Sequence, residues 1–460
     1  MNINRRKFFQ SLLGVVSISL LAPQLTFAQN KKKADALSWT NWSQNVQCEP
    51  ERILLPKSHE QLAGIIKEST SPIRLVGAGH SFSPIAATND TMISLGYMGN
   101  LNHIDNIKRT ASIQSGARLF QLTDALWKNG LCLNNQPDIN LQSLAGATAT
   151  ATHGSGRHFG SLSSLISEAR IIDANGITHY CDNGKNEELL LALGNHLGVL
   201  GAVSDLTFQA QEQFYLKTKS WMMSEDEAFA QADQLSQTHR HFEMFPLPHS
   251  DYILCVANDE ISAEEAQHSS PKSKDDAFET FKLIQKLTDY VPSMKGFIIN
   301  RAAETVDEEI TWGPAHQQLN HVRSLFFNEM EYTVPRENGL ACLKEVLNTI
   351  KKLDIDVIFP VEFRYTAAEK GWLSPFYDRA GCSISIHQFQ HIDYKKYFNL
   401  IEPIFIKYGG RPHWGKIHNL DASKLRKLYK HWDDFAAIRK SLDPKGKFLN
   451  PKMRQLLVNS

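Results

Sequence analysis

Cysteine is scarce in this sequence, and its few cysteines stand far apart. The 460 residues include only six: Cys48, Cys132, Cys181, Cys255, Cys342 and Cys382. No two of them form a C-x-x-C pair, the spacing typical of thioredoxin-like redox sites and of structural zinc sites. The sequence therefore supports no metal site of this kind, and we expect the cysteines to be free, buried thiols.

An excess of charge of either sign is also absent. Lysine and arginine together number 49, as do aspartate and glutamate, so the formal net charge is zero. Proteins that bind nucleic acids carry a basic face, so we expect no nucleic-acid partner. After residue 30, no apolar run is long enough to cross a bilayer. We therefore expect no transmembrane segment in the mature chain, while peripheral membrane contact stays open.

The first 28 residues differ in character from the rest. Arg5 and Arg6 precede an apolar run, Leu12–Leu21, and Thr26-Phe27-Ala28 offers small residues at both positions that determine cleavage. This pattern predicts a twin-arginine signal peptide that is cut after Ala28. An ordinary N-terminal helix or an uncleaved anchor is the alternative. The twin-arginine route carries folded proteins, so a cofactor can be bound before export to the periplasm.

The rest of the chain is long enough for two or three domains. Residues from about 45 to 212 have the pattern of compact α/β structure, and residues 213 to 410 are richer in amphipathic helical stretches. A glycine pair, Gly409-Gly410, opens the final segment, residues 411 to 460. We find no internal repeat or low-complexity tract.

A short predicted strand, Ile73–Val76, runs directly into a segment rich in glycine. That segment reads Gly77, Ala78, Gly79, His80, Ser81 and Phe82. Glycines let the backbone approach an anion closely, and successive N–H groups form a concavity that binds phosphate. The full G-x-G-x-x-G fingerprint of dinucleotide-binding proteins is missing, so a simple tight turn is the alternative.

A second segment, residues 143 to 156, consists almost entirely of small side chains. Such a segment fits where the backbone packs tightly against a flat, buried ligand, with hydroxyls and amides supplying the polar contacts. A flexible loop is the alternative, although the alanines and leucines make the segment apolar for a solvated linker. Its candidate binding residues are Ser143, Gly146, Thr150, Thr152, His153, Gly154 and Ser155.

Two predicted strands carry charged residues in alternating positions. On Val357–Tyr365, Glu362 and Arg364 point to the same face, and apolar residues point to the other. A buried charged pair is costly unless it is paired or functional, so a structural ion pair is the alternative to a site. On Cys382–Phe389, His387 lies on the polar face of the strand, where it can line a cavity. An ordinary core or surface histidine is the alternative.

Two further segments contain candidate residues. One is Pro412-His413-Trp414-Gly415-Lys416, which taken alone is equally compatible with a site and with an ordinary surface. The other is a glycine-containing turn around Gly198 and Val199, a pattern that also serves simple packing.

Taken in order, these segments resemble the FAD-dependent sugar-lactone and alditol oxidases of the vanillyl-alcohol oxidase and p-cresol methylhydroxylase superfamily. That family includes L-gulonolactone oxidase, D-arabinono-1,4-lactone oxidase and alditol oxidase. The resemblance covers nearly the whole mature chain. It implies an α+β fold of two domains, in which an FAD-binding domain of the vanillyl-alcohol oxidase type is covered by an α+β substrate domain. It also implies that the C-terminal segment returns to the FAD domain and the active site.

The resemblance assigns cofactor contacts to the glycine-rich segments. It implies that His80 is joined covalently to the flavin 8α methyl group and that Thr152 to Gly156 wraps the cofactor, largely through backbone. The turn at Gly198 and Val199 lies beside the adenine and pyrophosphate end. No cysteine lies near the small-residue segment, so we expect one covalent bond.

The resemblance also assigns the chemistry. Glu362 and Arg364 contact substrate hydroxyls, and Lys416 lies close to flavin and substrate, where a cation stabilises the reduced ring. The reaction implied is hydride transfer from a hydroxyl-bearing carbon, with proton loss assisted by Arg364, His387 and Lys416. No single base is assigned, and Ser143 is a further hydroxyl contact.

The substrate class implied is an aldono-1,4-lactone or an alditol, and the sequence does not choose between them. Oxygen, giving hydrogen peroxide, is the expected electron acceptor. A dehydrogenase of the same family, which uses a quinone or cytochrome, is one alternative. A non-catalytic carbohydrate-binding protein on a decayed flavin fold is the alternative of another class.

Overall fold

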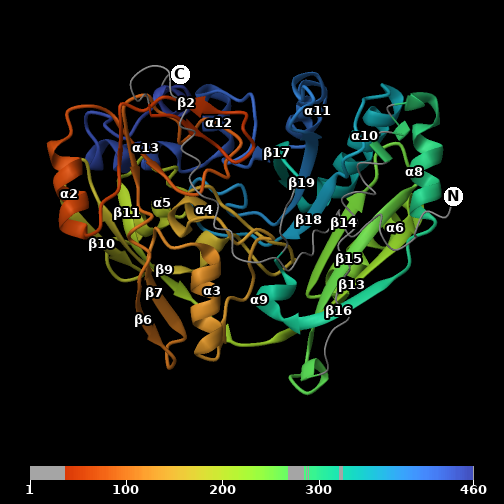
Figure 1. Cartoon of the computed structure of the whole chain (residues 1–460), viewed down its shortest axis with the longest axis horizontal. Coiled ribbons are helices and arrows are strands. Elements are labelled where there is room, and N and C mark those ends of the chain that lie inside the picture. Colours follow the sequence, from red (N-terminus) through yellow and green to blue (C-terminus); the bar gives the residue numbers. More distant parts are fainter. Residues whose placement is uncertain (1–36, 268–283, 286, 289, 321–324, 459–460) are drawn as a thin grey trace.

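The computed structural model describes residues 37–267, 284–285, 287–288, 290–320 and 325–458. The predicted signal peptide, residues 1–28, lies outside the described residues. Within the described chain, helices and sheets combine in two lobes that lie side by side (Figure 1). The expectation of an α+β fold is confirmed.

The first lobe contains a five-stranded antiparallel sheet and a small parallel sheet. The larger sheet has the order β10-β9-β11-β7-β6, and its strands are β6 (Leu101–Asp105), β7 (Thr110–Gln114), β9 (Ile166–Ile172), β10 (Thr178–Asp182) and β11 (Ala202–Gln209). The smaller sheet has the order β3-β5-β4, with β3 (Arg52–Leu54), β4 (Ile73–Val76) and β5 (Thr91–Ser94). The helices of this lobe include α2 (His59–Glu68), α3 (Leu119–Lys128), α4 (Leu144–Ala149) and α5 (Glu187–Leu193).

The two motif-bearing segments of this lobe pack directly against each other. The glycine-rich segment follows strand β4, and the small-residue segment begins at the N-terminus of helix α4. A Cβ atom added at Gly77 would lie only 1.9 Å from Ser143 Oγ, so a side chain at position 77 would collide with the second segment. Gly79 has φ = +72°, a left-handed conformation that favours glycine. The small residues are therefore required by the close approach of the two backbones.

The second lobe is built on one eight-stranded antiparallel sheet. Its order is β16-β13-β15-β14-β18-β19-β17-β20, with β13 (Tyr215–Ser224), β14 (His241–Pro246), β15 (Tyr252–Ile261), β16 (Glu309–Pro314), β17 (Phe327–Pro335), β18 (Glu362–Thr366), β19 (Gly381–Phe389) and β20 (Arg411–Pro412). The helices of this lobe include α6 (Glu225–Thr238), α8 (Lys295–Ala303), α9 (Ala315–Gln318), α10 (Gly339–Lys352) and α11 (Lys395–Lys407).

One face of the central strands is apolar. Side chains alternate along a strand, so Met330 and Tyr332 of β17 share a face with Ile384 and Ile386 of β19. All four are fully buried and belong to the main hydrophobic core. Tyr332 stacks on Phe405 of α11, with ring centroids 5.2 Å apart. This face of the sheet therefore holds α10 and α11 in place.

The opposite face of the same strands is polar and equally buried. Across β17 and β19, Glu329 pairs with His387 and Glu331 with Ser385. Ser385 also pairs with Glu362 of β18, so polar side chains continue over three neighbouring strands. Every one of these side chains is buried. Charged groups so deeply buried need partners. For Glu331 and Glu329, these partners include His153 of the first lobe and Lys416 of the C-terminal segment.

The C-terminal helices return to the first lobe. They are α12 (Ala422–Leu428), α13 (Trp432–Leu442) and α14 (Pro451–Leu457), coloured blue in Figure 1. The buried guanidinium of Arg74 donates to Phe448 O at 2.7 Å, and Asn450 Nδ2 donates to Ala87 O at 2.7 Å. The chain end is thus bound to the glycine-rich segment and its surroundings.

Two expected boundaries differ from the structure. Strand β18 begins at Glu362 rather than Val357, because Pro360 has no N–H to donate to a neighbouring strand. Strand β20 pairs with β17, so the large sheet extends past residue 410, where we expected the substrate domain to end. All six cysteines are free thiols, five of them buried as expected and Cys48 half-buried.

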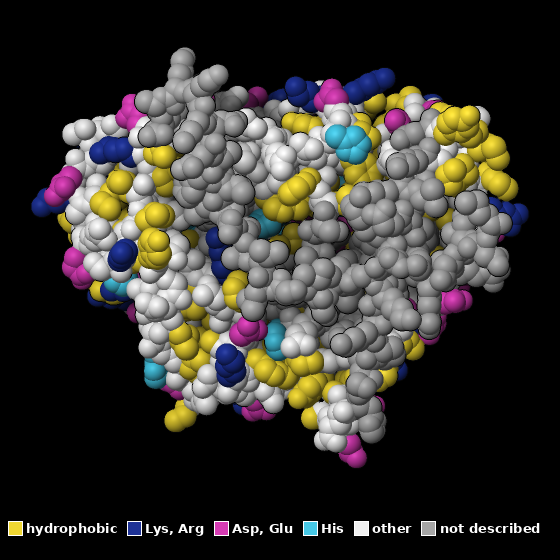
Figure 2. Space-filling view, in the orientation of Figure 1, with side chains coloured by type: hydrophobic (Ala, Val, Ile, Leu, Met, Phe, Trp, Pro, Cys, Tyr) yellow, Lys and Arg dark blue, Asp and Glu magenta, His cyan; other side chains and the backbone are white. Residues whose placement is uncertain are grey.

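In the view of Figure 2, basic and acidic side chains of the described residues are interspersed. No helix in the described part of the chain is long and apolar enough to span a membrane.

Candidate active site

The first lobe encloses a large cavity with an empty volume of about 1340 Å³, part of it open to solvent. Its walls come from segments that are far apart in the sequence, and they include Glu329 of the second lobe and Lys416 near the C-terminus. Most of the predicted cofactor contacts line it: Gly77, Ala78, Gly79, His80, Ser81, Phe82, Ser143, Gly146, Thr150, Thr152, Gly198, His413 and Lys416. Val199 is fully buried and does not line this cavity, and His153, Gly154 and Ser155 lie elsewhere.

Several buried polar atoms of this cavity lack a hydrogen-bond partner. They are Arg74 Nε, Gln142 Oε1, Ser143 Oγ and His196 Nε2. Unsatisfied buried polar atoms are rare in folded proteins, so their gathering around one cavity fits a polar ligand.

Two of these atoms, Arg74 Nε and His196 Nε2, are hydrogen-bond donors in the wall of the large cavity. His196 Nδ1 accepts from Gly198 N at 3.1 Å, so Nε2 carries the ring proton and can donate. Burial, reinforced by the charge of Arg74, lowers the pKa of His196 to about 3, so the ring is neutral at pH 7. The Arg74 guanidinium is charged, because burial lowers its pKa only to about 10. A diphosphate group fits these donors, and the residues present therefore fit FAD.

His80 lies in the wall of the same cavity. Its ring stacks on Trp42, with centroids 5.5 Å apart and planes 29° apart. Burial, reinforced by the positive charges of Arg118 and Lys416, lowers the pKa of His80 to about 4. At pH 7 the ring is therefore neutral, with one nitrogen lone pair free to act as a nucleophile.

A second cavity, with an empty volume of about 500 Å³, lies beside the Glu362–Arg364 pair. Gly154 and Ser155 line it too, so the small-residue segment contributes to both cavities. Arg364 forms an ion pair with Glu362 and lies 3.8 Å from Glu243. Burial would lower the pKa of Arg364, but Glu362, followed by Glu243, outweighs burial and raises it. Glu362 and Arg364 are thus an ion pair that also forms a cavity wall.

Sequence reasoning missed Glu329 and Glu331, the two buried carboxylates of strand β17. Glu329 forms an ion pair with Lys416 and lies 3.6 Å from His387 Nε2. Burial would raise the pKa of Glu329, but Lys416 and His387 lower it to about 2. The signal was the alternation of side chains along Phe327–Pro335, which places two carboxylates on one face of a buried strand. The same kind of alternation places Glu362 and Arg364 on one face of their strand.

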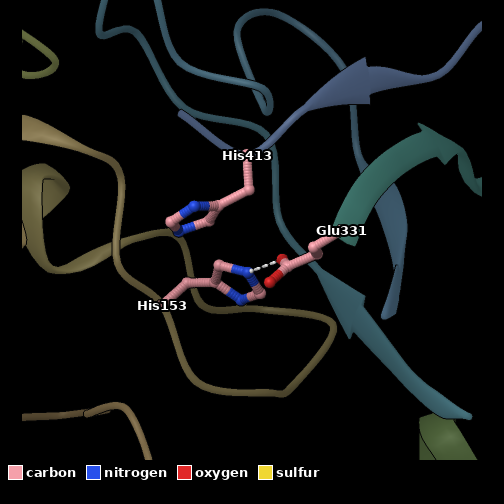
Figure 3. Close-up of side chains that lie close together, drawn as sticks. All are labelled: His153, Glu331 and His413. Carbon is pink, nitrogen blue, oxygen red and sulfur yellow. Dashed lines mark hydrogen bonds and ion pairs between the residues drawn. The ribbon is translucent and has the colours of Figure 1, made fainter. Parts of the chain in front are cut away.

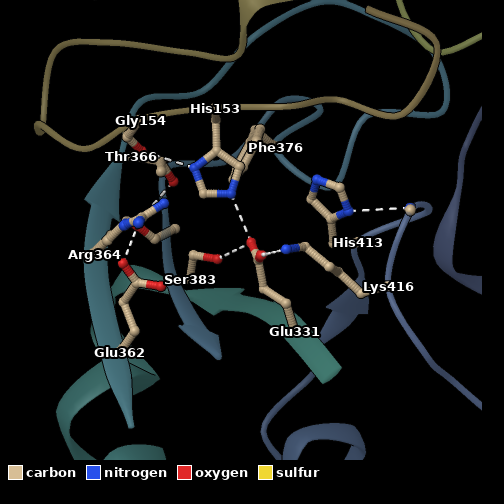
Figure 4. A network of polar contacts seen from close by, with 12 residues as sticks. His153, Gly154, Glu331, Glu362, Arg364, Thr366, Phe376, Ser383, His413 and Lys416 are labelled. Carbon is tan, nitrogen blue, oxygen red and sulfur yellow. Dashed lines mark hydrogen bonds and ion pairs between the residues drawn. The ribbon is translucent and has the colours of Figure 1, made fainter. Parts of the chain in front are cut away.

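Glu331 connects the two lobes. It accepts from His153 Nε2 at 2.6 Å and from Ser383 Oγ (Figures 3 and 4). Lys416 Nζ lies 3.9 Å from its other oxygen. Burial would raise the pKa of Glu331, but the charges of His153 and His413 hold it well below its usual range.

His153 acts as a link between lobes. Its Nδ1 lies 2.8 Å from Gly154 O, and its Nε2 lies 2.6 Å from Glu331. Both partners are oxygen acceptors, so each ring nitrogen of His153 faces an acceptor. The ligand atoms of His153, Glu331 and His413 lie within 4.8 Å of one another. Hydrogen bonds and ion pairs already engage His153 and Glu331, so this cluster needs no metal ion.

A second cluster lies where the two cavities approach each other. The ligand atoms of Glu329, Glu362 and His387 lie within 4.8 Å of one another. Glu329 lines the large cavity, and Glu362 lines the second one. His387 lines neither, and its Nδ1 donates to Pro360 O at 3.1 Å. The structure thus brings four predicted catalytic residues, Glu362, Arg364, His387 and Lys416, around this junction.

The fold of the whole chain is similar to that of a solved oxidase. It matches the crystal structure of cholesterol oxidase from B. sterolicum with a TM-score of 0.78, covering 91% of this chain and 96% of that chain. The identity is only 16%, so this match shows the fold alone. Residues 50–182 match the FAD binding domain family. The fold and the large cavity therefore define an FAD-binding protein of the expected two-domain type.

Residues 206–456 match the D-arabinono-1,4-lactone oxidase family. L-gulono-1,4-lactone dehydrogenase of Mycobacterium tuberculosis is 33% identical over 91% of this chain and 99% of its own length. L-gulonolactone oxidase of Bos taurus is 27% identical, and alditol oxidase of a Streptomyces species is 26% identical. Each covers 91% of this chain and 98% of its own length. The chain belongs to the D-arabinono-1,4-lactone oxidase family.

The buried Glu331 charge yields a prediction about stability. Replacing Glu331 by Gln keeps a side-chain acceptor but removes the charge, so the free energy of unfolding at pH 7 should fall by roughly 2–4 kcal/mol. Because the folded-state pKa lies below 4.5, the stability that the carboxylate contributes is present above that pH and lost below it. The difference between wild type and variant should therefore shrink as the pH falls from 5 to 3.

Urea denaturation followed by tryptophan fluorescence measures this difference. The matched control is Glu345→Gln, which removes a surface ion pair with Lys407 and should change the stability by less than about 1 kcal/mol. An equal loss in both variants, or a difference that stays constant down to pH 3, would contradict the assignment.

Proposed function

We propose that this protein oxidises a hydroxyl-bearing carbon of a neutral sugar-derived substrate, an aldono-1,4-lactone or an alditol, with FAD as the hydride acceptor. The observation that carries the proposal is the junction of the two cavities. The large cavity fits the cofactor, and the second cavity offers polar side chains to a substrate. Glu329, Glu362 and His387 stand between them. The names of the relatives, which are lactone and alditol oxidases and dehydrogenases, support this substrate class.

The residues around the junction of the two cavities have different roles in the proposed reaction. Arg364 and Glu362, fixed to each other as an ion pair, bind the hydroxyl of the reacting carbon. Bound flavin supplies the acceptor for the hydride that leaves this carbon. Lys416, held by Glu329 in the cavity wall, supplies a cation that stabilises negative charge on the reduced cofactor.

The hydroxyl proton also needs an acceptor. His387 Nδ1 donates to a carbonyl oxygen, so Nε2 is the ring nitrogen that is left to receive a proton. This nitrogen faces the cluster and can take up the proton, with the Glu329 carboxylate stabilising the imidazolium that forms.

For the electron acceptor we propose molecular oxygen, reduced to hydrogen peroxide. A second candidate is a dehydrogenase that passes electrons to a quinone or cytochrome. It is favoured by the relative with 33% identity, which is named a dehydrogenase, whereas those with 26% and 27% are named oxidases.

Flavin absorbance under anaerobic conditions tests substrate and acceptor together. Mixing the purified yellow protein with aldonolactones and, separately, with alditols should bleach the flavin with at least one class. Admission of air should restore the colour within the time of one turnover. Bleaching followed by slow recovery in air would favour the dehydrogenase. A flavin that neither class bleaches would remove the proposed function.

The flavin tether is a further part of the proposal. We propose a covalent bond from His80 to the flavin, supported by its neutral ring in the wall of the large cavity. Acid precipitation of wild type should leave the flavin on the protein, and His80→Ala should release it. In the control His103→Asn, which replaces an exposed histidine outside the large cavity, the flavin should stay attached. Flavin that remains on denatured His80→Ala would refute the assignment.

We also propose export to the periplasm by the twin-arginine route. The support is the Arg5-Arg6 pair, the apolar run behind it and the small residues that end at Ala28. Expression in a host with this pathway should give periplasmic protein whose first residue is Gln29. Replacing both arginines by lysine should keep the protein in the cytoplasm. Periplasmic protein that still begins at Met1 would contradict cleavage.

A further inference from the structure

The second cavity extends away from the Glu362–Arg364 pair into the substrate lobe. Its lining includes apolar side chains, among them Phe245, Val256 and Leu319, which are all buried. Polar side chains from both lobes complete the lining. A polyhydroxylated carbon chain presents both C–H and O–H groups, and such a mixed lining suits both.

Two buried side chains of this cavity each contain a polar atom that has no hydrogen-bond partner in the protein. Ser155 and Gln136 are 3% and 4% exposed, and Ser155 Oγ and Gln136 Oε1 are both unpartnered. Gln136 Nε2 donates to His316 O at 2.7 Å, which fixes the amide and leaves Oε1 as an acceptor in need of a donor. A ligand hydroxyl can donate to Gln136 and can both donate to and accept from Ser155.

Two further amides are held in place by threonines. Thr218 Oγ1 donates to Asn258 Oδ1 at 2.5 Å, and Thr311 Oγ1 donates to Gln318 Oε1 at 3.0 Å. Because these hydrogen bonds fix the two amide oxygens, the N–H groups of Asn258 and Gln318 are the donors that these side chains offer to a ligand. Asn258 and Gln318 therefore complement Gln136, which offers an acceptor.

The charges that line the cavity select against anions. Asp138, Glu243 and Glu362 contribute three carboxyl groups, and Arg364 contributes one guanidinium, so the formal charge of these described lining residues is minus two. A carboxylate or phosphate on the ligand would meet this negative wall at a Coulombic cost in a buried site.

We infer that the second cavity is an extended subsite that recognises hydroxyls remote from the reacting carbon, through Gln136, Ser155, Asn258 and Gln318, and that it selects neutral over anionic sugar derivatives. This inference rests on the proposed function, since it names the part of the substrate pocket that lies beyond the Glu362–Arg364 pair.

The test compares ligands of increasing length in wild type and in two variants. Ser155→Ala removes a hydroxyl without a partner in the protein, so the fold should be unaffected. Gln136→Leu removes the unpartnered oxygen and also the bond to His316 O. Its matched control is Asn320→Leu, because Asn320 Nδ2 also donates to His316 O, at 2.6 Å, but Asn320 does not line the cavity.

Calorimetry gives the dissociation constants of glycerol, xylitol, sorbitol, an aldono-1,4-lactone and the matching aldonate, and anaerobic flavin reduction gives the rates. In wild type, affinity should rise with chain length, and the lactone should bind at least tenfold more tightly than its aldonate. Ser155→Ala and Gln136→Leu should weaken the binding of the five- and six-carbon ligands by about 3- to 10-fold. They should leave glycerol unchanged, and Asn320→Leu should behave as wild type.

Several results would overturn the inference. These are equal losses for short and long ligands, no loss for either variant, an aldonate that binds as tightly as its lactone, or no binding of any polyol by wild type. Failure of the proposed function would give a result different from failure of the subsite. If the ligands bind with the expected length dependence but none of them reduces the flavin, the subsite stands and the oxidation does not.

Discussion

The rest of the structure depends on the burial of charge along strand β17. Glu329 and Glu331 lie in the interior, and their partners come from elsewhere: Lys416 from the C-terminal segment and His153 from the small-residue segment. A buried ion costs several kcal/mol in lost hydration, and only a complete set of partners offsets that cost. The three chain segments must therefore meet at one place. That requirement fixes the substrate lobe against the cofactor lobe, and it positions Lys416 in the cavity wall.

The alternation of side chains along a strand turns this constraint into a site. The apolar residues of β17, β18 and β19 bind helices α10 and α11, and the polar residues of the same strands face the first lobe. The alternation of apolar and polar side chains therefore places the hydrophobic core on one face of the sheet and the candidate active site on the other. The two cavities meet at this polar face, with Glu329 in the wall of one and Glu362 in the wall of the other.

Much of this could be predicted from the sequence, because local motifs carry local geometry. The glycine-rich segment had to follow a strand and line an anion site, and Gly77 to Phe82 do line the large cavity. The alternation on β18 correctly placed Glu362 and Arg364 on one face. Long-range pairing could not be predicted. The partners of Glu329 and Glu331 are Lys416 and His153, 87 and 178 residues away, and no local pattern encodes that meeting. The same holds for Gln136 and Asn258, which belong to different lobes and meet only at the second cavity.

The central claim is that the cofactor and the substrate occupy two cavities that meet at the Glu329, Glu362 and His387 cluster. A crystal structure of the protein with bound flavin and a slowly reacting five- or six-carbon polyol tests it most directly. The claim predicts flavin density in the large cavity that reaches His80. It also predicts polyol density in the second cavity, with one hydroxyl at Arg364 and a remote hydroxyl at Gln136 or Ser155. Polyol density outside the second cavity, or flavin density away from His80, would contradict it.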